Sequence, residues 1–241
     1  MSLEYNNIDV GDRIKISPSG FSNFAGNPRL WYENNILKTG TFRGNTNTVV
    51  GTIIHNRIEQ WFNNEPIDED AEAVYIESFN ETRDVEPWKV VDDVKRLWVL
   101  LEVELPTWEK PSEMEKAVRL DIPNSNYTIA GTFDYLRGTT LGDYKTASSA
   151  PKKIKVSHKI QMSLYVLSAR AMGTQITHWE VTYIVKTKTP KIVVLNEPID
   201  EEFVAETKQE IKDMIIRVEL VNERPELESV LFFKNRDSFL T

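Results

Sequence analysis

The stretch that decides the fold comprises residues 127–145 and reads YTIAGTFDYLRGTTLGDYK. Its two halves, 127–136 and 140–145, are rich in the β-branched and aromatic residues that are typical of strands. The turn-forming tripeptide Arg137-Gly138-Thr139 separates them. Because so short a connection suits neighbouring antiparallel strands, the stretch predicts a hairpin within a β-sheet.

Two acidic residues and a lysine occupy this expected hairpin. Asp134 ends the first strand, and Asp143 lies two residues before Lys145, so both of these side chains are expected on one face of the second strand. Converging carboxylates form a minimal oxygen site for Mg²⁺ or Mn²⁺, which can lower the pKa of a bound water and polarise a phosphoryl oxygen. A neighbouring lysine can stabilise negative charge in a transition state. The same residues would also fit an ordinary surface salt bridge.

The rest of the chain alternates helical and strand-like segments. Expected helices lie between Thr48 and Pro66, around 69–82, between Pro87 and Pro106, over 156–172 and over 201–222. Further expected strands cover 115–122, 176–186 and 191–195. This order predicts a single α/β or α+β domain over residues 1–241, with one mixed sheet and a helical insertion at about 59–107.

Charge is unevenly distributed along the chain. The net charge is −8, yet the segment Glu59–Glu86 alone contains ten acidic residues and one basic residue, which gives it −9. By contrast, no acidic residue occurs between Asp143 and Glu180. Lysines gather in this acid-free part at Lys152, Lys153, Lys155 and Lys159. Such an arrangement is compatible with DNA binding, although charge runs are usually solvated faces.

Composition excludes several classes of protein. The chain has no cysteine, so it holds no disulfide, no thiolate metal site and no Cys nucleophile. Its longest uncharged apolar stretch, about 160–169, is shorter than the roughly 20 residues that span a bilayer. The first 12 residues are polar and acidic, unlike a signal peptide. We therefore expect a soluble, cytoplasmic protein without a membrane partner.

Three further polar residues have suitable chemistry and spacing. His55 lies in an expected helix, at the edge of its apolar face. Gln161 and Tyr165 are four residues apart in the helix that follows the lysines, so they share one side of it. Each could also be an ordinary core or surface residue, and so could His158, one turn before Gln161.

In order and rough spacing, the sequence resembles the RecB-like nucleases of the PD-(D/E)XK superfamily, which also contains CRISPR-associated and phage exonucleases. The resemblance covers about residues 16–185. It rests on His55, Glu115, Gly131-Thr132-Phe133-Asp134, Asp143-Tyr144-Lys145-Thr146 and Gln161-Met162-Ser163-Leu164-Tyr165, and on the N-terminal segments Ile16-Ser17-Pro18-Ser19 and Asn27-Pro28-Arg29-Leu30-Trp31-Tyr32. It implies a restriction-endonuclease-like α/β core, with a central mixed sheet flanked by helices and a helical insertion.

The resemblance also implies a metal site. Asp134 and Asp143 would be ligands of Mg²⁺ or Mn²⁺, together with the backbone carbonyl of Tyr144, and His55 would be an additional ligand. Many relatives also hold an iron–sulfur cluster through four cysteines. Because this chain has none, the cluster cannot be present, and packing between the N- and C-terminal helices must replace it.

Catalytic roles follow from the same resemblance. Lys145 would be the catalytic lysine, and Gln161 and Tyr165 would position that lysine and the scissile strand. Glu115 would take part in the outer shell of the metal. Glu113 is an alternative to Glu115, because it lies two residues away on the same face of the strand.

We therefore expect a Mg²⁺- or Mn²⁺-dependent deoxyribonuclease, most simply an exonuclease acting on single-stranded DNA or DNA ends and leaving a 5′-phosphate on one product. The four lysines at 152–159 would contact phosphates. Trp31, Tyr32 and Phe42 would stack on bases or pack in the core. A structure-specific endonuclease, an inactive DNA-binding or assembly protein and an enzyme acting on small phosphates are the alternatives. A role in phage DNA processing, or in recombination and repair, follows by family analogy alone.

Overall fold

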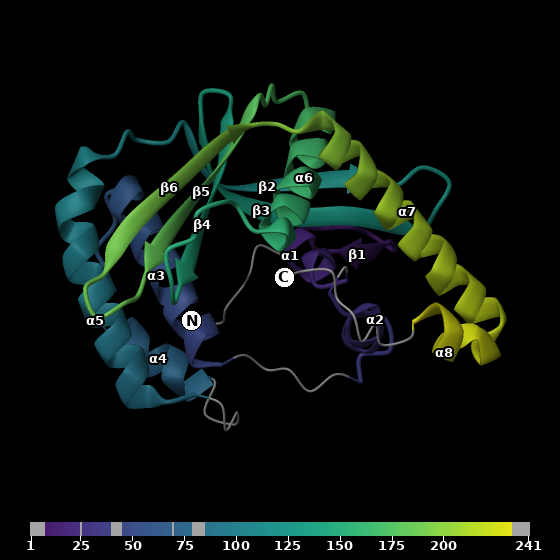
Figure 1. The fold of residues 1–241 in the computed structure, drawn as a ribbon, viewed down its shortest axis with the longest axis horizontal. Helices are drawn as coiled ribbons and strands as arrows, with labels where there is room; N and C mark the ends of the chain where they lie inside the picture. Colours follow the sequence, from purple (N-terminus) through teal and green to yellow (C-terminus); the bar gives the residue numbers. More distant parts are fainter. Residues whose placement is uncertain (1–7, 25, 40–44, 69, 79–84, 233–241) are drawn as a thin grey trace.

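A mixed sheet of six strands runs through the centre of the molecule, and helices cover both of its faces (Figure 1). The computed structural model describes residues 8–24, 26–39, 45–68, 70–78 and 85–232. Within them the strands are β1 (Ile14–Ile16), β2 (Glu113–Asp121), β3 (Tyr127–Arg137), β4 (Thr140–Ala147), β5 (His178–Val185) and β6 (Lys191–Pro198). The α-helices are α1 (Pro18–Ser22), α2 (Pro28–Asn35), α3 (Thr46–Asn63), α4 (Ala71–Ser78), α5 (Pro87–Glu104), α6 (Val156–Ala171), α7 (Glu201–Glu223) and α8 (Glu228–Leu231).

Strand β3 organises the sheet because it pairs with three other strands. β2 lies antiparallel along one edge of it. On the other edge, β1 runs parallel to residues 127–129, and β4 runs antiparallel to residues 135–137. β5 pairs in parallel with β4, and β6 pairs antiparallel with β5. Since β1 and β4 share one edge of β3, residues 130–134 have no strand partner on that edge among the described residues, and the described sheet has a gap there.

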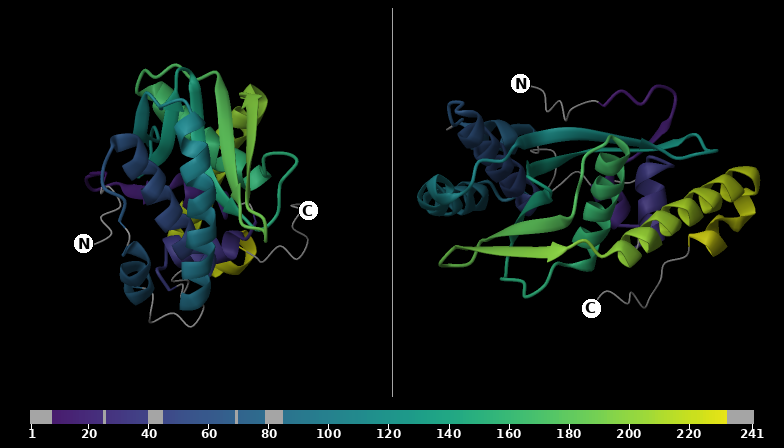
Figure 2. Two further views of the ribbon diagram at one scale, coloured as in Figure 1. Left: turned by 90° about the vertical axis from the view of Figure 1, so that its left-hand side faces the viewer. Right: turned by 90° about the horizontal axis from the view of Figure 1, so that it is seen from above.

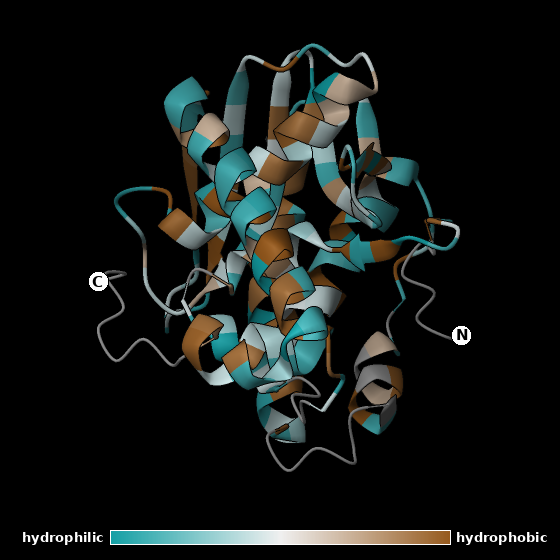
Figure 3. Cartoon of the chain, turned by 90° about the vertical axis from the view of Figure 1, so that its right-hand side faces the viewer, coloured by the Kyte–Doolittle hydropathy of each residue, from teal (hydrophilic) through white to brown (hydrophobic). Residues whose placement is uncertain are grey.

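Helices from distant parts of the chain cover the two faces of the sheet (Figure 2). On one face, α3 and α5 pack on apolar residues that include Tyr135 and Tyr144. On the other face, α6 and the start of α7 pack on a set that includes Phe133 and Val181. The buried residues of α7 are almost all apolar, and Figure 3 shows apolar and polar residues alternating along the helix on the side of the molecule that α7 covers. The gap in the sheet therefore lies between two helical layers.

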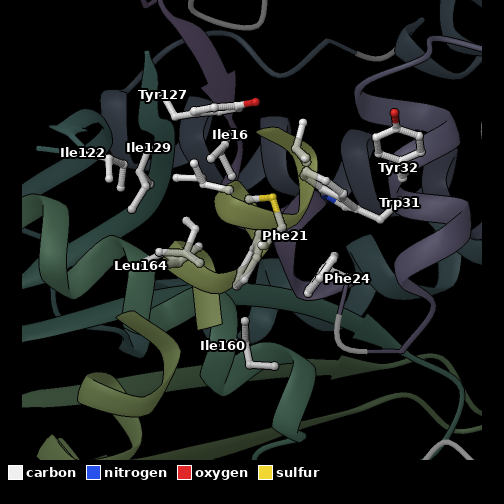
Figure 4. Packing of buried hydrophobic residues seen from close by; sticks show 14 of the residues in the cluster. Ile16, Phe21, Phe24, Trp31, Tyr32, Ile122, Tyr127, Ile129, Ile160 and Leu164 are labelled. Carbon is white, nitrogen blue, oxygen red and sulfur yellow. The ribbon is translucent and has the colours of Figure 1, made fainter. Parts of the chain in front are cut away.

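A further apolar cluster joins the two ends of the described chain (Figure 4). Trp31 and Tyr32 of α2 are 3% and 2% exposed, and the ring of Tyr32 stacks on Phe232 with ring centroids 4.3 Å apart. The guanidinium of Arg29 lies 2.8 Å from the carboxylate of Glu228. Trp31 and Tyr32 are thus core residues and not a base-stacking surface, whereas Phe42 lies outside the described residues.

The predicted α/β class and the predicted hairpin are confirmed, because β3 and β4 pair antiparallel. Strand β1 was not predicted, since three residues are too few to show a period. Helix α3 begins at Thr46, two residues early, because the side chain of Asn45 accepts hydrogen bonds from the first free N–H groups of the helix. Helix α4 falls within the predicted segment 69–82, of which residues 69 and 79–82 lie outside the described part. No helix in that part is long and apolar enough to cross a membrane.

We predict that Gly142→Ala destabilises the protein by about 1–3 kcal/mol, as overpacking of a core does. A Cβ at Gly142 would overlap the ring of Tyr135, its cross-strand partner. That ring cannot easily move aside, because its hydroxyl donates a 2.7 Å hydrogen bond to buried Glu180. Urea unfolding of the two proteins measures the difference.

Gly51→Ala is the matched control. The Cβ added at Gly51 would lie 3.4 Å from its nearest neighbour, Thr146 Oγ1, which is ordinary contact. Because Gly51 lies inside α3, alanine there should stabilise the helix by up to about 1 kcal/mol. Unchanged stability of Gly142→Ala would show that the Tyr135 ring is not held in place.

Candidate active site

Three acidic residues stand in one row across three strands, at the gap in the sheet. β2 and β3 pair on both sides of Glu115 in a register that places it opposite Asp134, although these two residues do not themselves pair. The ladder between β3 and β4 ends at Tyr135 and Gly142, one step before Asp134 and Asp143. Both ladders are therefore interrupted at the row formed by Glu115, Asp134 and Asp143.

The backbone of Glu115 departs from the strand conformation at this row. Its φ is +44°, in the left-handed region that residues other than glycine rarely adopt. Its neighbour Lys116 returns to the regular ladder, and the alternative acidic residue, Glu113, forms an ion pair with Lys116 at 2.6 Å. The structure thus places Glu115, and not Glu113, at the gap.

Asp134 partly fills the interruption with its side chain. Its Oδ2 accepts a 2.6 Å hydrogen bond from the backbone N–H of Tyr144, which a strand carbonyl would otherwise satisfy. The same oxygen lies 3.5 Å from Nδ1 of His55, which α3 contributes from one helical layer. The ring of Tyr144 packs against α3 and α5, edge to face with His55. Asp134 therefore links three segments: β3, β4 and α3.

Asp143 is held from the other helical layer. Lys145 Nζ lies 2.9 Å and 2.7 Å from its two carboxylate oxygens. The amide of Gln161 on α6 donates hydrogen bonds to Asp143 Oδ1 at 3.1 Å and to the hydroxyl of Tyr165 at 3.2 Å. Oδ2 of Asp143 is buried and forms the ion pair with Lys145 but no hydrogen bond within the described residues. This oxygen retains the capacity to bind a cation.

These side chains line one cleft of about 1050 Å³. Of the residues predicted from the sequence, it contains His55, Glu115, Asp134, Asp143, Lys145, Gln161 and Tyr165. The N-terminal segment closes part of it, since Pro18 packs so tightly on β3 that a Cβ at Gly131 would lie 2.7 Å from the proline ring. Glycine is therefore required at 131, in the segment that leads to Asp134.

Burial raises the pKa values of all three carboxyl groups, and a neighbouring carboxylate adds to the shift at Glu115 and Asp143. Burial, followed by the charge of Asp134, raises the pKa of Glu115 to about 8. Burial also raises the pKa values of Asp134 and Asp143 to about 6, although Lys145 opposes both shifts. Burial and then Lys145 lower the pKa of His55 to about 4, so its ring is neutral near pH 7. A bound cation would relieve this accumulation of negative charge.

The donor set fits a hard divalent cation, because it consists of carboxylate oxygens and a neutral imidazole. Within the described residues, however, no group of three such side chains is placed so that it could hold a metal ion as it stands. The ammonium of Lys145 pairs with Asp143, and the amide of Tyr144 binds Asp134. Cation binding therefore requires local adjustment of these contacts.

The four lysines predicted to bind DNA do not line the cleft. Lys152, Lys153 and Lys155 are exposed just before α6. Lys159 differs from them, because it forms a 2.7 Å ion pair with Glu197 and lies over the ring of Trp179. The sequence groups these four lysines, but the fold pairs the last one with an acidic residue and leaves Lys152, Lys153 and Lys155 exposed.

Sequence reasoning missed four charged residues of the cleft: Lys15, Arg57, Glu59 and Asp68. Glu59 lies one helical turn after His55, and this spacing was a usable signal. Burial, and then the charges of Glu65 and Asp134, raise the pKa of Glu59. Lys15 belongs to β1, whose three residues gave no signal.

Comparison with known proteins agrees with the fold. The model of the PD-(D/E)XK nuclease superfamily matches residues 15–228, and the chain belongs to this superfamily. Its members generally use divalent metal ions. No curated protein sequence matches the chain.

Solved structures show a similar fold at low sequence identity. A protein from Eubacterium rectale named "putative exonuclease" is 12% identical, with 99% of this chain and 90% of that chain covered and a TM-score of 0.66. An alkaline exonuclease from Laribacter hongkongensis is 11% identical, with 91% and 95% covered and a TM-score of 0.44. The structure of the same enzyme in complex with dAMP is 13% identical in sequence. The match covers 92% of this chain and 96% of that chain, with a TM-score of 0.49.

We predict that Glu115→Gln stabilises the metal-free protein, and that this gain grows between about pH 5 and pH 8. The folded state keeps the proton of Glu115 up to a pKa of about 8, whereas the unfolded chain releases it near 4.5. Stability of the wild type therefore falls as pH rises through this window, and glutamine removes that contribution. Thermal unfolding of both proteins between about pH 5 and pH 8, in the presence of a chelator, measures this difference in stability.

Glu113→Gln provides the control for this measurement, because it removes the same charge from the same strand at a residue paired with Lys116. It should give no gain that grows with pH. An equal response of the two variants would contradict the assigned environment of Glu115.

Proposed function

We propose that the protein is a divalent-metal-dependent deoxyribonuclease that hydrolyses phosphodiester bonds. The row of Glu115, Asp134 and Asp143, with Lys145 against Asp143 and His55 against Asp134, is the observation that carries this proposal. Membership of the PD-(D/E)XK superfamily supports the same reaction. In this proposal residues 1–241 form one nuclease domain, and the helical insertion at about 59–107 contributes a wall of the cleft.

The proposed metal ligands are Asp134, Asp143, the imidazole of His55 and the backbone carbonyl of Tyr144, with Glu115 in the outer shell. Mg²⁺ or Mn²⁺, when bound, would supply a water of lowered pKa and polarise a phosphoryl oxygen. The neutral ring of His55 leaves one nitrogen without a proton, so it can act as a ligand.

Lys145 is the proposed catalytic lysine. Burial lowers its pKa, but Asp143 and Asp134 together raise it above the usual value, so the side chain remains an ammonium. That charge can stabilise negative charge developing on the phosphoryl oxygens. Gln161 and Tyr165 hold Asp143 in place through their shared hydrogen bonds, and in this proposal they also position the scissile strand.

We propose single-stranded DNA or DNA ends as the substrate, and exonucleolytic cleavage in the cytoplasm as the reaction. The exonuclease name of the similarly folded Eubacterium rectale protein agrees with this choice. Exposed Lys152, Lys153 and Lys155 at the start of α6 supply positive charge next to the helix that covers the site. Phosphates of the strand would bind there.

The direct test is digestion of end-labelled linear DNA and of closed circular DNA, with and without Mn²⁺. The wild type should degrade linear DNA only when metal is present and should leave closed circles intact. Asp143→Asn and Lys145→Met should each lose at least about a hundredfold in rate, as removal of a charge-stabilising group does.

Asp213→Asn and Lys212→Met on the exposed face of α7 are matched controls, and both should retain full activity. Cleavage of closed circles would exclude an exonuclease but keep the nuclease. Absence of metal-dependent cleavage of any DNA would refute the proposed function.

A second prediction concerns DNA affinity. Replacing Lys152, Lys153 and Lys155 by glutamine should weaken single-stranded DNA binding and reduce the slope of log K against log salt, by about 0.7 for each phosphate that the protein no longer neutralises. Lys159→Gln should change neither quantity much, because Glu197 already neutralises Lys159. Fluorescence anisotropy over a range of salt concentrations, with Ca²⁺ in place of Mn²⁺, measures both. If Lys159→Gln weakened binding as much as the other three substitutions, the distinction between the ion-paired Lys159 and the three exposed lysines would be contradicted.

A further inference from the structure

His158 continues the line of polar side chains that α6 directs at the site. It lies three residues before Gln161 and seven before Tyr165, so all three share one face of the helix. Tyr165 approaches β3 at Gly131, and Gln161 binds Asp143 on β4. His158 reaches the next strand, β5, where its Nδ1 lies 2.8 Å from the hydroxyl of Tyr183.

Tyr183 connects His158 to the strand of Lys145. It is fully buried, and in the parallel pairing of β4 with β5 it is the partner of Lys145, so both side chains lie on the face that α6 covers. Lys145 lines the cleft, whereas His158 and Tyr183 do not. Tyr183 therefore lies beside Lys145 on the neighbouring strand, and both aromatic side chains lie outside the cleft.

The hydrogen bonds of the Tyr183 hydroxyl favour one tautomer of His158. The backbone N–H of Lys155 donates to this hydroxyl at 3.4 Å. The hydroxyl proton is then available for Nδ1 of His158, which accepts it only as a neutral ring protonated on Nε2. Burial, followed by the charges of Lys145 and Lys155, lowers the pKa of His158 to about 3, in agreement with a neutral ring.

We propose that His158 and Tyr183 form a positioning pair for Lys145, holding the first turn of α6 against β5 and keeping the ammonium directed at Asp143. A neutral His158 ring suits this role, because a protonated ring near Lys145 would repel the Lys145 ammonium toward solvent. The role of the pair in catalysis rests on the proposed nuclease function. The geometry of the pair does not depend on that function.

Nuclear magnetic resonance of ¹⁵N-histidine-labelled protein tests the geometry without any activity. Between pH 6 and pH 8, His158 should show a proton on Nε2 and none on Nδ1, and Tyr183→Phe should abolish this fixed state. His178, which is on the same strand as Tyr183 and whose Nδ1 lies 3.0 Å from the Thr177 hydroxyl, serves as the internal reference for a histidine without contact to Tyr183. A doubly protonated ring, or a proton on Nδ1, would overturn the pair even in a protein without nuclease activity.

Kinetics of the wild type and variants tests the role. His158→Ala and Tyr183→Phe should lower kcat by about ten- to a hundredfold with little change in KM, as misplacement of a reacting group does. His158→Asn should recover most of the loss, because its amide oxygen can accept the proton of Tyr183. The double variant should be no worse than the poorer single variant, since the two residues act as one unit.

Two outcomes would overturn the positioning role: losses that add in the double variant, or losses that appear only in KM or only with lowered thermal stability. His178→Ala should retain the rate of the wild type. A wild type without activity refutes the proposed function, and the magnetic resonance result then decides the pair alone.

Discussion

The site depends on the repulsion between carboxylates placed side by side in a sheet. Two like charges about 5 Å apart repel by about 3 kcal/mol at an effective dielectric constant of about 20. Glu115, Asp134 and Asp143 share one row; burial raises the pKa values of all three, and the charge of Asp134 raises those of Glu115 and Asp143 further. The ammonium of Lys145 compensates part of this charge through its ion pair with Asp143. A site so deficient in positive charge favours cations.

The gap in the sheet explains why groups from both helical layers meet at this row. A continuous sheet would separate His55 on α3 from Gln161 on α6. Here β3 leaves β4 after Tyr135, and the side chain of Asp134 takes over the backbone amide of Tyr144. His55 reaches Asp134 from one side, and Gln161 reaches Asp143 from the other. The interrupted pairing is thus the structural basis of the cleft.

The sequence predicted local features well and distant partners poorly. The hairpin around Asp134 and Asp143 was predictable because strand composition and a short turn are local signals. The ion pair of Lys159 with Glu197 on β6 was not, because no local pattern relates a helix to a strand so far along the chain. Lys15 was missed for the same reason, since β1 exists only through its parallel pairing with β3. Roles of single residues therefore required the fold.

Two unfavourable features coincide at this row, and their coincidence argues for function. A residue such as Glu115 in the left-handed region costs about 1–3 kcal/mol and persists only where its surroundings determine it. Regular pairing of β2 with β3 on both sides supplies that constraint. The strained backbone carries a buried carboxyl group next to two others, so strain and charge both oppose folding at the same place. Packing alone would favour an apolar side chain at position 115. Binding of a cation would explain both the strained backbone of Glu115 and its buried carboxyl group.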